Sequence, residues 1–171
     1  MGLQRRKRNR LREYNYNLNG SYFITICTKD KKQLFWKYDN RYTCYVGANF
    51  VRQYSESWLS NIGIIVDNEI KHINSIYKDS VYVDKYVIMP NHIHMIITID
   101  VQPDGRTQFA PTVSRVTKQF KGSVTKRIGV SVWQKSFYDH IIRNEVDYLE
   151  KWNYIHTNPH RWNSDELYVE E

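Results

Sequence analysis

Hydrophobic residues follow two spacings along this chain, and each spacing predicts a different kind of element. Four segments are dense in β-branched and aromatic residues and predict strands at 22–28, 80–89, 92–100 and 137–143. Three others repeat apolar residues with a helical period and predict amphipathic helices at 60–77, 112–128 and 144–158. Because strands and helices intermix in one short chain, we expect an α+β fold with helices packed on a single antiparallel sheet.

Polar residues mark the ends of the predicted helices. Residues suited to N-caps precede all three, namely Ser60, Thr112 and Asn144. Asp147 follows the last of these caps by three residues, in a capping-box-like position. We expect the last helix to end near Asn158, because Pro159 disfavours helical geometry in the residue before it.

The strands at 80–89 and 92–100 predict an antiparallel hairpin that turns at Pro90-Asn91. Simple alternation in the first of them places one set of side chains on a common face, namely Tyr82, Asp84, Tyr86 and Ile88. The pattern is weaker over 29–58, where we expect a turn at 29–32 and a further strand at 43–51.

The length of 171 residues suits one domain with a substantial core. We expect a basic arm over 1–20, the folded domain over 21–162 and an acidic tail over 163–171. Cys27 and Cys44 form no CxxC pair, and no apolar run reaches the length of a membrane span. We therefore expect a cytoplasmic protein with reduced thiols and no membrane partner.

Positive charge is concentrated in two places. The net charge is +7, and six cationic residues with no acid lie in the first twelve positions: Arg5, Arg6, Lys7, Arg8, Arg10 and Arg12. A second acid-free run, 105–138, contains the helix at 112–128, whose cations are Arg115, Lys118, Lys121, Lys126 and Arg127. This distribution favours a polyanionic partner, most simply nucleic acid. The alternative is a solvated tail and an ordinary basic helix face.

Two histidines stand at the start of the strand at 92–100. His92 and His94 are two residues apart, so a strand projects both imidazoles to one face and Ile93 to the other. Paired imidazoles on a rigid face suit a divalent metal ion. The alternative is a pair of hydrogen-bonded or solvated histidines on an exposed sheet face.

The last predicted helix carries a second candidate group. Tyr154 and Asn158 are four residues apart and share a helix face, so the phenol can act as a nucleophile while the amide oxygen serves as a third metal ligand. A free tyrosine is a poor nucleophile, with a pKa of about 10, and needs a nearby metal or base. The alternative for Tyr154 is an ordinary packing residue, since the chain has 14 tyrosines.

Four blocks of this sequence resemble, in order, those of the REP-associated tyrosine transposases, a branch of the HUH single-strand tyrosine transposases. The most specific is YVIMPNHIHMII at 86–97, which contains the HUH motif. The others are NGSYFITICT at 19–28, VWQKSFYDHIIR at 132–143 and YIHTNP at 154–159. Together they span most of residues 10–162, although the stretch 37–58 has no counterpart in the resemblance.

The resemblance implies a ferredoxin-like, HUH endonuclease-type fold and an enzyme that nicks and rejoins DNA. His92 and His94 would bind Mg²⁺ or Mn²⁺, Asn158 would complete or adjoin that site, and Tyr154 would form a 5′-phosphotyrosine intermediate. Members of the wider family often have Gln in place of Asn158, whose side chain is one methylene shorter. His140 and His156 are possible auxiliary residues, with a hydrogen-bonded structural role as the alternative.

The implied substrate is single-stranded or hairpin DNA, held by the basic arm and helix through its phosphates. Exposed aromatic residues can stack unpaired bases, for which Trp36 and Trp58 are weak candidates because most tryptophans pack. No nucleotide cofactor is required. The REP-associated branch implies a monomer, and a homodimer is the alternative.

Two other functions are compatible with the same residues. A hairpin-binding protein without catalysis would need the basic segments but no metal ion. A metal-dependent phosphoesterase would use His92 and His94 with water as the nucleophile, together with a carboxylate, for which Asp84 and Asp100 are only loosely suitable.

Overall fold

The computed structural model describes residues 19–37, 58–101 and 111–170. Its strands are β1 (Gly20–Cys27), β2 (Val81–Ile88), β3 (His92–Ile99) and β4 (Tyr138–Ile142). Its helices are α1 (Asn61–Tyr77), α2 (Val113–Ile128) and α3 (Glu145–Thr157), with 3₁₀ turns at Lys29–Lys31, Lys78–Ser80 and Asn158–Ser164. The strands predicted at 22–28, 80–89, 92–100 and 137–143 and all three predicted helices are confirmed, within two residues at each boundary.

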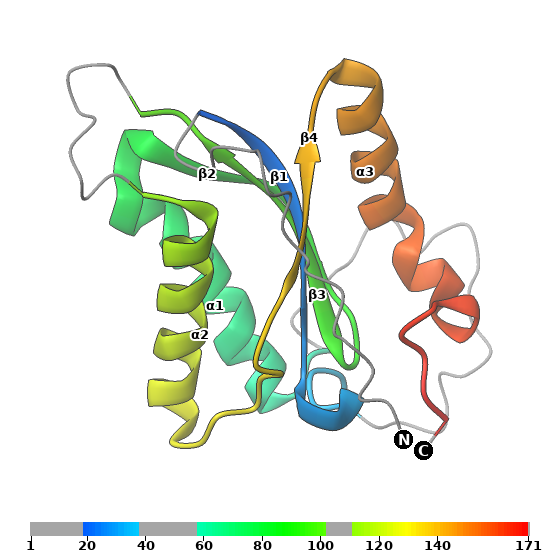
Figure 1. Cartoon of the computed structure of the whole chain (residues 1–171). Coiled ribbons are helices and arrows are strands. Elements are labelled where there is room, and N and C mark those ends of the chain that lie inside the picture. Colours follow the sequence, from blue (N-terminus) through cyan, green and yellow to red (C-terminus); the bar gives the residue numbers. More distant parts are fainter. Residues whose placement is uncertain (1–18, 38–57, 102–110, 171) are drawn as a thin grey trace, which may run out of the picture.

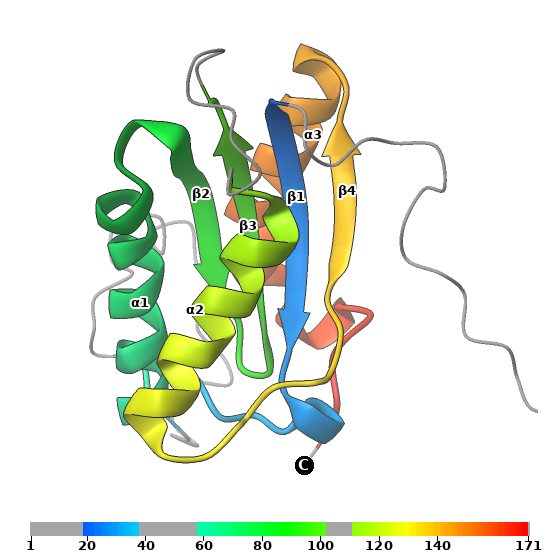
Figure 2. The same cartoon turned by 60° about the vertical axis from the view of Figure 1, so that its left-hand side comes forward.

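The strands form one antiparallel sheet in the order β2-β3-β1-β4. Together with the chain order β1-α1-β2-β3-α2-β4, this is the ferredoxin-like arrangement, so the predicted fold class is confirmed. Helices α1 and α2 cover one face of the sheet, and α3 is the one described helix on the other (Figures 1 and 2). The strands β1 and β3 are central, which leaves β2 and β4 at the edges.

The helices begin at the predicted caps. The side chains of Ser60, Thr112 and Asn144 accept hydrogen bonds from backbone N–H groups in the first turns of α1, α2 and α3. Helix α2 ends at Gly129, whose φ of 86° is the left-handed geometry that glycine adopts without strain. Local capping chemistry therefore fixes where these elements begin and end.

The two faces of the sheet bury different amounts of apolar surface. The large core lies between the sheet and α1 and α2, and is filled largely by isoleucine and valine. The opposite face has a small cluster under α3, in which Ile155 is the helix's buried residue. Tyr148 and Trp152 join Ile155 in packing on the sheet.

The predicted common face of β2 is wrong, because a β-bulge interrupts its alternation. The register with β3 shifts between Val83 and Lys85, so Asp84 is the extra residue. Tyr82 pairs with Thr98 on the α3 side, whereas Tyr86 pairs with Met95 on the opposite side.

The expected end of the last helix is nearly correct, but its reason is not. Helix α3 ends at Thr157, yet Asn158 keeps helical torsions (φ −55°, ψ −43°) despite preceding Pro159. The chain tightens into the 3₁₀ turn Asn158–Ser164 instead of becoming extended.

Several predictions lie outside the described residues. They are the basic arm up to residue 18 and the strand at 43–51. Within the described ranges, no helix is both long enough and apolar enough to cross a membrane.

The start of α1 packs unusually closely against the segment before it. The Ser60 side chain donates to the carbonyl of Leu34, and the Ser60 N–H donates to the carbonyl of Phe35. A Cβ at Gly63 would collide with that Phe35 carbonyl, whereas a Cβ at Gly122 in α2 would meet no atom within 4 Å.

Replacing these two glycines by alanine should have opposite effects on stability. We expect Gly63→Ala to lower the free energy of unfolding by about 1–3 kcal/mol through overpacking. Gly122→Ala should raise it by up to about 1 kcal/mol, because alanine is the better helix former. Urea unfolding of both variants beside the parent measures the difference, and equal values would contradict the close approach at Gly63.

Candidate active site

His92 and His94 lie side by side on the α3 face of the sheet. Their ring centroids are 4.5 Å apart, and the side chain of Ile93 is buried in the core on the other face. His92 is 0% and His94 3% exposed. The predicted sharing of one face is confirmed, and the alternative of solvated histidines on an exposed face is wrong.

The Asn91 side chain fixes the tautomer of His92. Its amide nitrogen donates to the carbonyls of Lys31 and Leu167, at 3.2 and 2.8 Å, so its oxygen must face His92. That oxygen lies 2.8 Å from His92 Nδ1 and can only accept, so Nδ1 carries the proton. In the neutral ring, Nε2 then has a free lone pair, which is the form that binds a metal ion.

His94 is held by β1 and by aromatic rings. Thr25 Oγ1 lies 2.8 Å from His94 Nδ1, because Thr25 and His94 are register partners. The ring of Phe23 stacks on His94 at 5.1 Å. These contacts involve Nδ1 and one face of the ring, and they leave His94 Nε2 unused.

Both Nε2 atoms are buried without a hydrogen-bond partner among the described residues. His92, His94 and Asp165 form a cluster in which one possible ligand atom from each residue lies within 4.8 Å of the other two. A buried polar atom without a partner costs about 1–3 kcal/mol, which a bound cation would offset. Two imidazoles and a carboxylate suit Mn²⁺ or another divalent transition metal ion better than Mg²⁺.

Sequence reasoning missed Asp165, which it assigned to the acidic tail. The residue follows the 3₁₀ turn, and its carboxylate accepts hydrogen bonds from the Asn158 amide and the Leu167 N–H. Asp84 and Asp100 instead accept from Thr98 and Asn19 and do not belong to the cluster. No local motif marks Asp165, because its role depends on where the chain turns after α3.

Asn158 adjoins this cluster and is 3% exposed. Its Nδ2 donates to Asp165 Oδ2 at 2.9 Å, and its Oδ1 is buried with no hydrogen-bond partner in the part of the chain that the structure describes. The Asn158 amide therefore orients the Asp165 carboxylate. Its service as a metal ligand stays a prediction.

Tyr154 lies beside the histidines at the edge of solvent. Its ring meets His94 edge-on at 5.1 Å and Phe23 at 5.8 Å, and the residue is 42% exposed. Burial raises the pKa of the phenol, as do the nearby charges of Asp165 and Glu166, whereas a hydrogen bond with Asn158 lowers it. A phenol in this environment stays protonated at neutral pH and needs a cation or a base to react.

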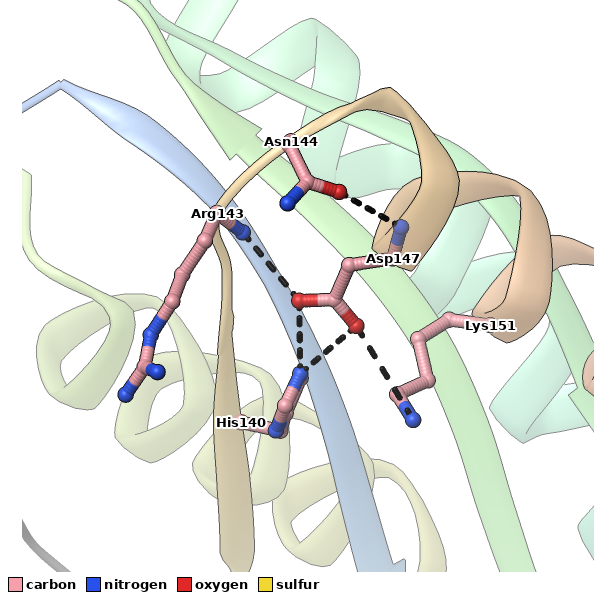
Figure 3. Close-up of polar contacts among 5 residues, drawn as sticks. All are labelled: His140, Arg143, Asn144, Asp147 and Lys151. Carbon is pink, nitrogen blue, oxygen red and sulfur yellow. Dashed lines mark hydrogen bonds and ion pairs between the residues drawn. The ribbon is translucent and has the colours of Figure 1, made fainter.

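Polar contacts at the first turn of α3 fix the helix that carries Tyr154. Figure 3 shows the Asp147 carboxylate facing His140, with both oxygens 2.9 Å from His140 Nε2. The Arg143 N–H donates to the same carboxylate, and Lys151 lies 4.0 Å away. As in a capping box, the Asn144 side chain accepts from the Asp147 N–H. The Asp147 carboxylate, however, accepts from the N–H of Arg143, the residue before the cap, and not from that of Asn144.

The two auxiliary histidines have different surroundings. His140 pairs with Asp147 and so joins α3 to β4. His156 stacks on Trp152 at 5.4 Å, and Trp152 also lies under the ammonium of Lys85 at 4.2 Å. Both contacts are structural, and a role in catalysis stays a prediction for each histidine.

The basic helix α2 lies on the opposite face of the sheet from the histidines (Figure 2). Lys121 donates to the carbonyls of Gln134 and Ser136, and Arg127 pairs with the buried carboxylate of Glu69. Lys118 and Lys126 are exposed, as is Arg115. The predicted DNA-binding cations of α2 are therefore not brought together with the site.

Comparisons with known proteins place this arrangement among relatives. The chain is 34% identical to an uncharacterised protein of Haemophilus influenzae, over 99% of this chain and 96% of that protein. It is 35% identical to the REP-associated tyrosine transposase of Escherichia coli, over 47% of this chain and 46% of that protein, so this match spans less than half of the relative. No protein-family model matches the chain.

A solved structure shares the fold. It is the structure of a REP-associated tyrosine transposase bound to a REP hairpin, with a TM-score of 0.55 and 21% sequence identity. The similarity covers 93% of this chain and 89% of that one.

The buried histidines predict a pH-dependent stability. Burial lowers the pKa of His92 from 6.5 to about 4, which the Asp165 charge only partly opposes, and burial also lowers that of His94. Between these two pH values the unfolded chain binds more protons than the folded one, so acid favours unfolding.

With a chelator present, we expect the free energy of unfolding to be level above pH 6.5 and to fall as the pH drops toward 4. His92→Gln should flatten this slope, and His72→Gln, at an exposed site in α1, should not. Urea unfolding at a series of pH values measures the slopes. A His92→Gln slope equal to that of the parent would contradict a buried neutral imidazole.

Proposed function

Because this chain belongs to the family of REP-associated tyrosine transposases, we propose that it nicks and rejoins single-stranded or hairpin DNA through a covalent tyrosine intermediate. The observation that carries the proposal is the meeting of two groups on one face of the sheet. The unpaired Nε2 atoms of His92 and His94 lie with Asp165 in a possible cation site, and the Tyr154 ring contacts His94.

His92, His94 and Asp165 would hold the metal ion, with Asn158 beside them. When bound, the ion would stabilise the charge that develops on the phosphate oxygens and favour the phenolate of Tyr154. Asn91 and Thr25 keep the imidazoles in place from behind. Such outer partners preserve the ligand geometry.

In the proposed reaction, Tyr154 Oη attacks the phosphorus of a phosphodiester. A bond forms between Oη and phosphorus, and the bond from phosphorus to the 3′ oxygen breaks. The phenol loses its proton during the attack, the departing oxygen takes up a proton as a 3′-hydroxyl, and the 5′ phosphate stays on Tyr154. A later attack by a 3′-hydroxyl reverses the step, so no nucleotide cofactor is needed.

A DNA hairpin is the substrate best supported by the comparisons, since the solved relative is bound to a REP hairpin. The exposed cations of α2 lie on the far face of the sheet. DNA that reached both α2 and Tyr154 would have to pass around an edge of the sheet. The basic arm, Arg5–Arg12, stays a candidate for phosphate contacts.

One observation favours a second candidate function. A phosphoesterase that uses water would need a carboxylate beside the histidines, and Asp165 supplies one. The two enzymes differ in whether cleavage requires the Tyr154 hydroxyl.

The first experiment compares the parent with Tyr154→Phe on labelled single-stranded DNA carrying a palindrome from beside the gene, with Mn²⁺ or Mg²⁺. We expect a covalent protein–DNA adduct in the parent, no adduct in Tyr154→Phe, and a fall in cleavage of at least about a thousandfold. Tyr168→Phe, at another exposed tyrosine, should cleave like the parent. Denaturing gels measure both products.

Other results would support other functions. Metal-dependent cleavage that survives Tyr154→Phe would indicate the water-using phosphoesterase. Binding without cleavage, with several candidate hairpins and both metal ions, would indicate a non-catalytic hairpin-binding protein.

The metal site has a separate test at Asp165. We expect Asp165→Asn to weaken Mn²⁺ binding by more than about tenfold, because loss of even an outer-shell partner commonly costs that much. Glu166→Gln removes the same charge one residue away and should bind Mn²⁺ like the parent. Calorimetric titration measures both affinities, and equal losses would indicate a general charge effect instead of coordination.

A further inference from the structure

Tyr138 lies in the same row of the sheet as the histidines. It is the register partner of Thr25 in β1, and Thr25 is the register partner of His94 in β3. Register partners project to the same face, so Tyr138 and His94 stand on one face, two strands or about 10 Å apart. That separation is comparable to the distance between a phosphate and the base of a neighbouring nucleotide.

The ring of Tyr138 is available to a ligand. The residue is 51% exposed, although it belongs to a strand, and β4 is the edge of the sheet. It belongs to neither apolar cluster. An exposed aromatic face beside a reaction centre is the kind of surface on which an unpaired base stacks.

The backbone that carries Tyr138 is well fixed. Lys121 reaches from α2 to the carbonyls of Gln134 and Ser136, and Trp133 Nε1 donates to the carbonyl of Lys121. On the other side, His140 is tied to Asp147 (Figure 3). The ring therefore stands on a rigid strand, which limits the entropy lost when a base stacks on it.

We infer that Tyr138 is a stacking platform for the unpaired base next to the reacting phosphodiester. This inference rests on the proposed function, because it needs a DNA strand at Tyr154. It adds a residue that binds the base and not the phosphate. Stacking of this kind tolerates any base, so Tyr138 would position the strand without reading its sequence.

The test measures DNA binding in a Tyr154→Phe background, where no covalent bond can form. The probe is a fluorescent DNA hairpin with a short thymidine tail on each side, and anisotropy gives its affinity. Tyr138→Thr removes the ring but keeps a strand-forming residue, and Tyr138→Phe keeps the ring. The matched control is Tyr82→Thr, at a 38% exposed tyrosine on the same face of β2, four residues farther along the register.

We expect Tyr138→Thr to weaken binding by about fivefold to a hundredfold, and Tyr138→Phe and Tyr82→Thr to bind like the parent. The salt dependence of binding should not change, because no phosphate contact is lost. A single abasic position in one tail should cause the same loss, and combining it with Tyr138→Thr should cause no further loss.

Parent-like affinity in Tyr138→Thr would overturn the inference and leave the proposed function intact. An equal loss of affinity in Tyr82→Thr, or a reduced salt dependence of binding in Tyr138→Thr, would also overturn it. The same holds if no abasic position in either tail reproduces the loss caused by Tyr138→Thr. Failure of the parent to bind any hairpin, with cleavage also absent, would overturn the proposed function and this inference with it. Circular dichroism of each variant verifies that it is folded.

Discussion

The pairing of β1 with β3 is the constraint on which the candidate site depends. Its register sets Thr25 opposite His94 and keeps both imidazoles on the face that α3 covers. A slip of one residue would turn the histidines into the large core and Ile93 toward Tyr154. The alternation of apolar residues in β3 makes that slip costly, because the isoleucines of one face fill the core against α1 and α2. Packing on one face of the sheet thus fixes the orientation of the polar groups on the other face.

Helix α3 is held differently from α1 and α2. It buries little apolar surface, with Ile155 as its buried residue. Polar and cationic contacts also attach it to the sheet. Asp147 joins its first turn to β4, and Lys85 of β2 lies over Trp152 in its middle. Of the three described helices, the one that carries the proposed nucleophile Tyr154 therefore has the smallest share of the core. Its position relies on directional contacts, which define orientation more closely than apolar packing does.

Much of the fold could be predicted from local patterns, because those patterns act locally. Ser60 and Asn144 cap their helices, and the spacing of His92 and His94 correctly placed both on one face. The face of β2 could not be predicted, since nothing in its sequence marks Asp84 as a bulge. The role of Asp165 could not be predicted for a different reason. Asp165 lies beside the histidines only because of the path that the chain takes after α3. Residues that depend on such long-range placement carry no periodic signal.

The bonds of Asn91 also have a consequence for the order in which the molecule is assembled during synthesis. The bond from Asn91 to Leu167 spans 76 positions of the chain, and that from Thr25 to His94 spans 69. The four strands precede α3 and Asp165 in the chain, so the sheet leaves the ribosome before Tyr154 and the Asp165 carboxylate do. At that stage the imidazoles of His92 and His94 would lie on the sheet without the Asp165 carboxylate. The candidate metal cluster is complete only once the segment after α3 has packed against the sheet, because Asp165 follows the 3₁₀ turn Asn158–Ser164.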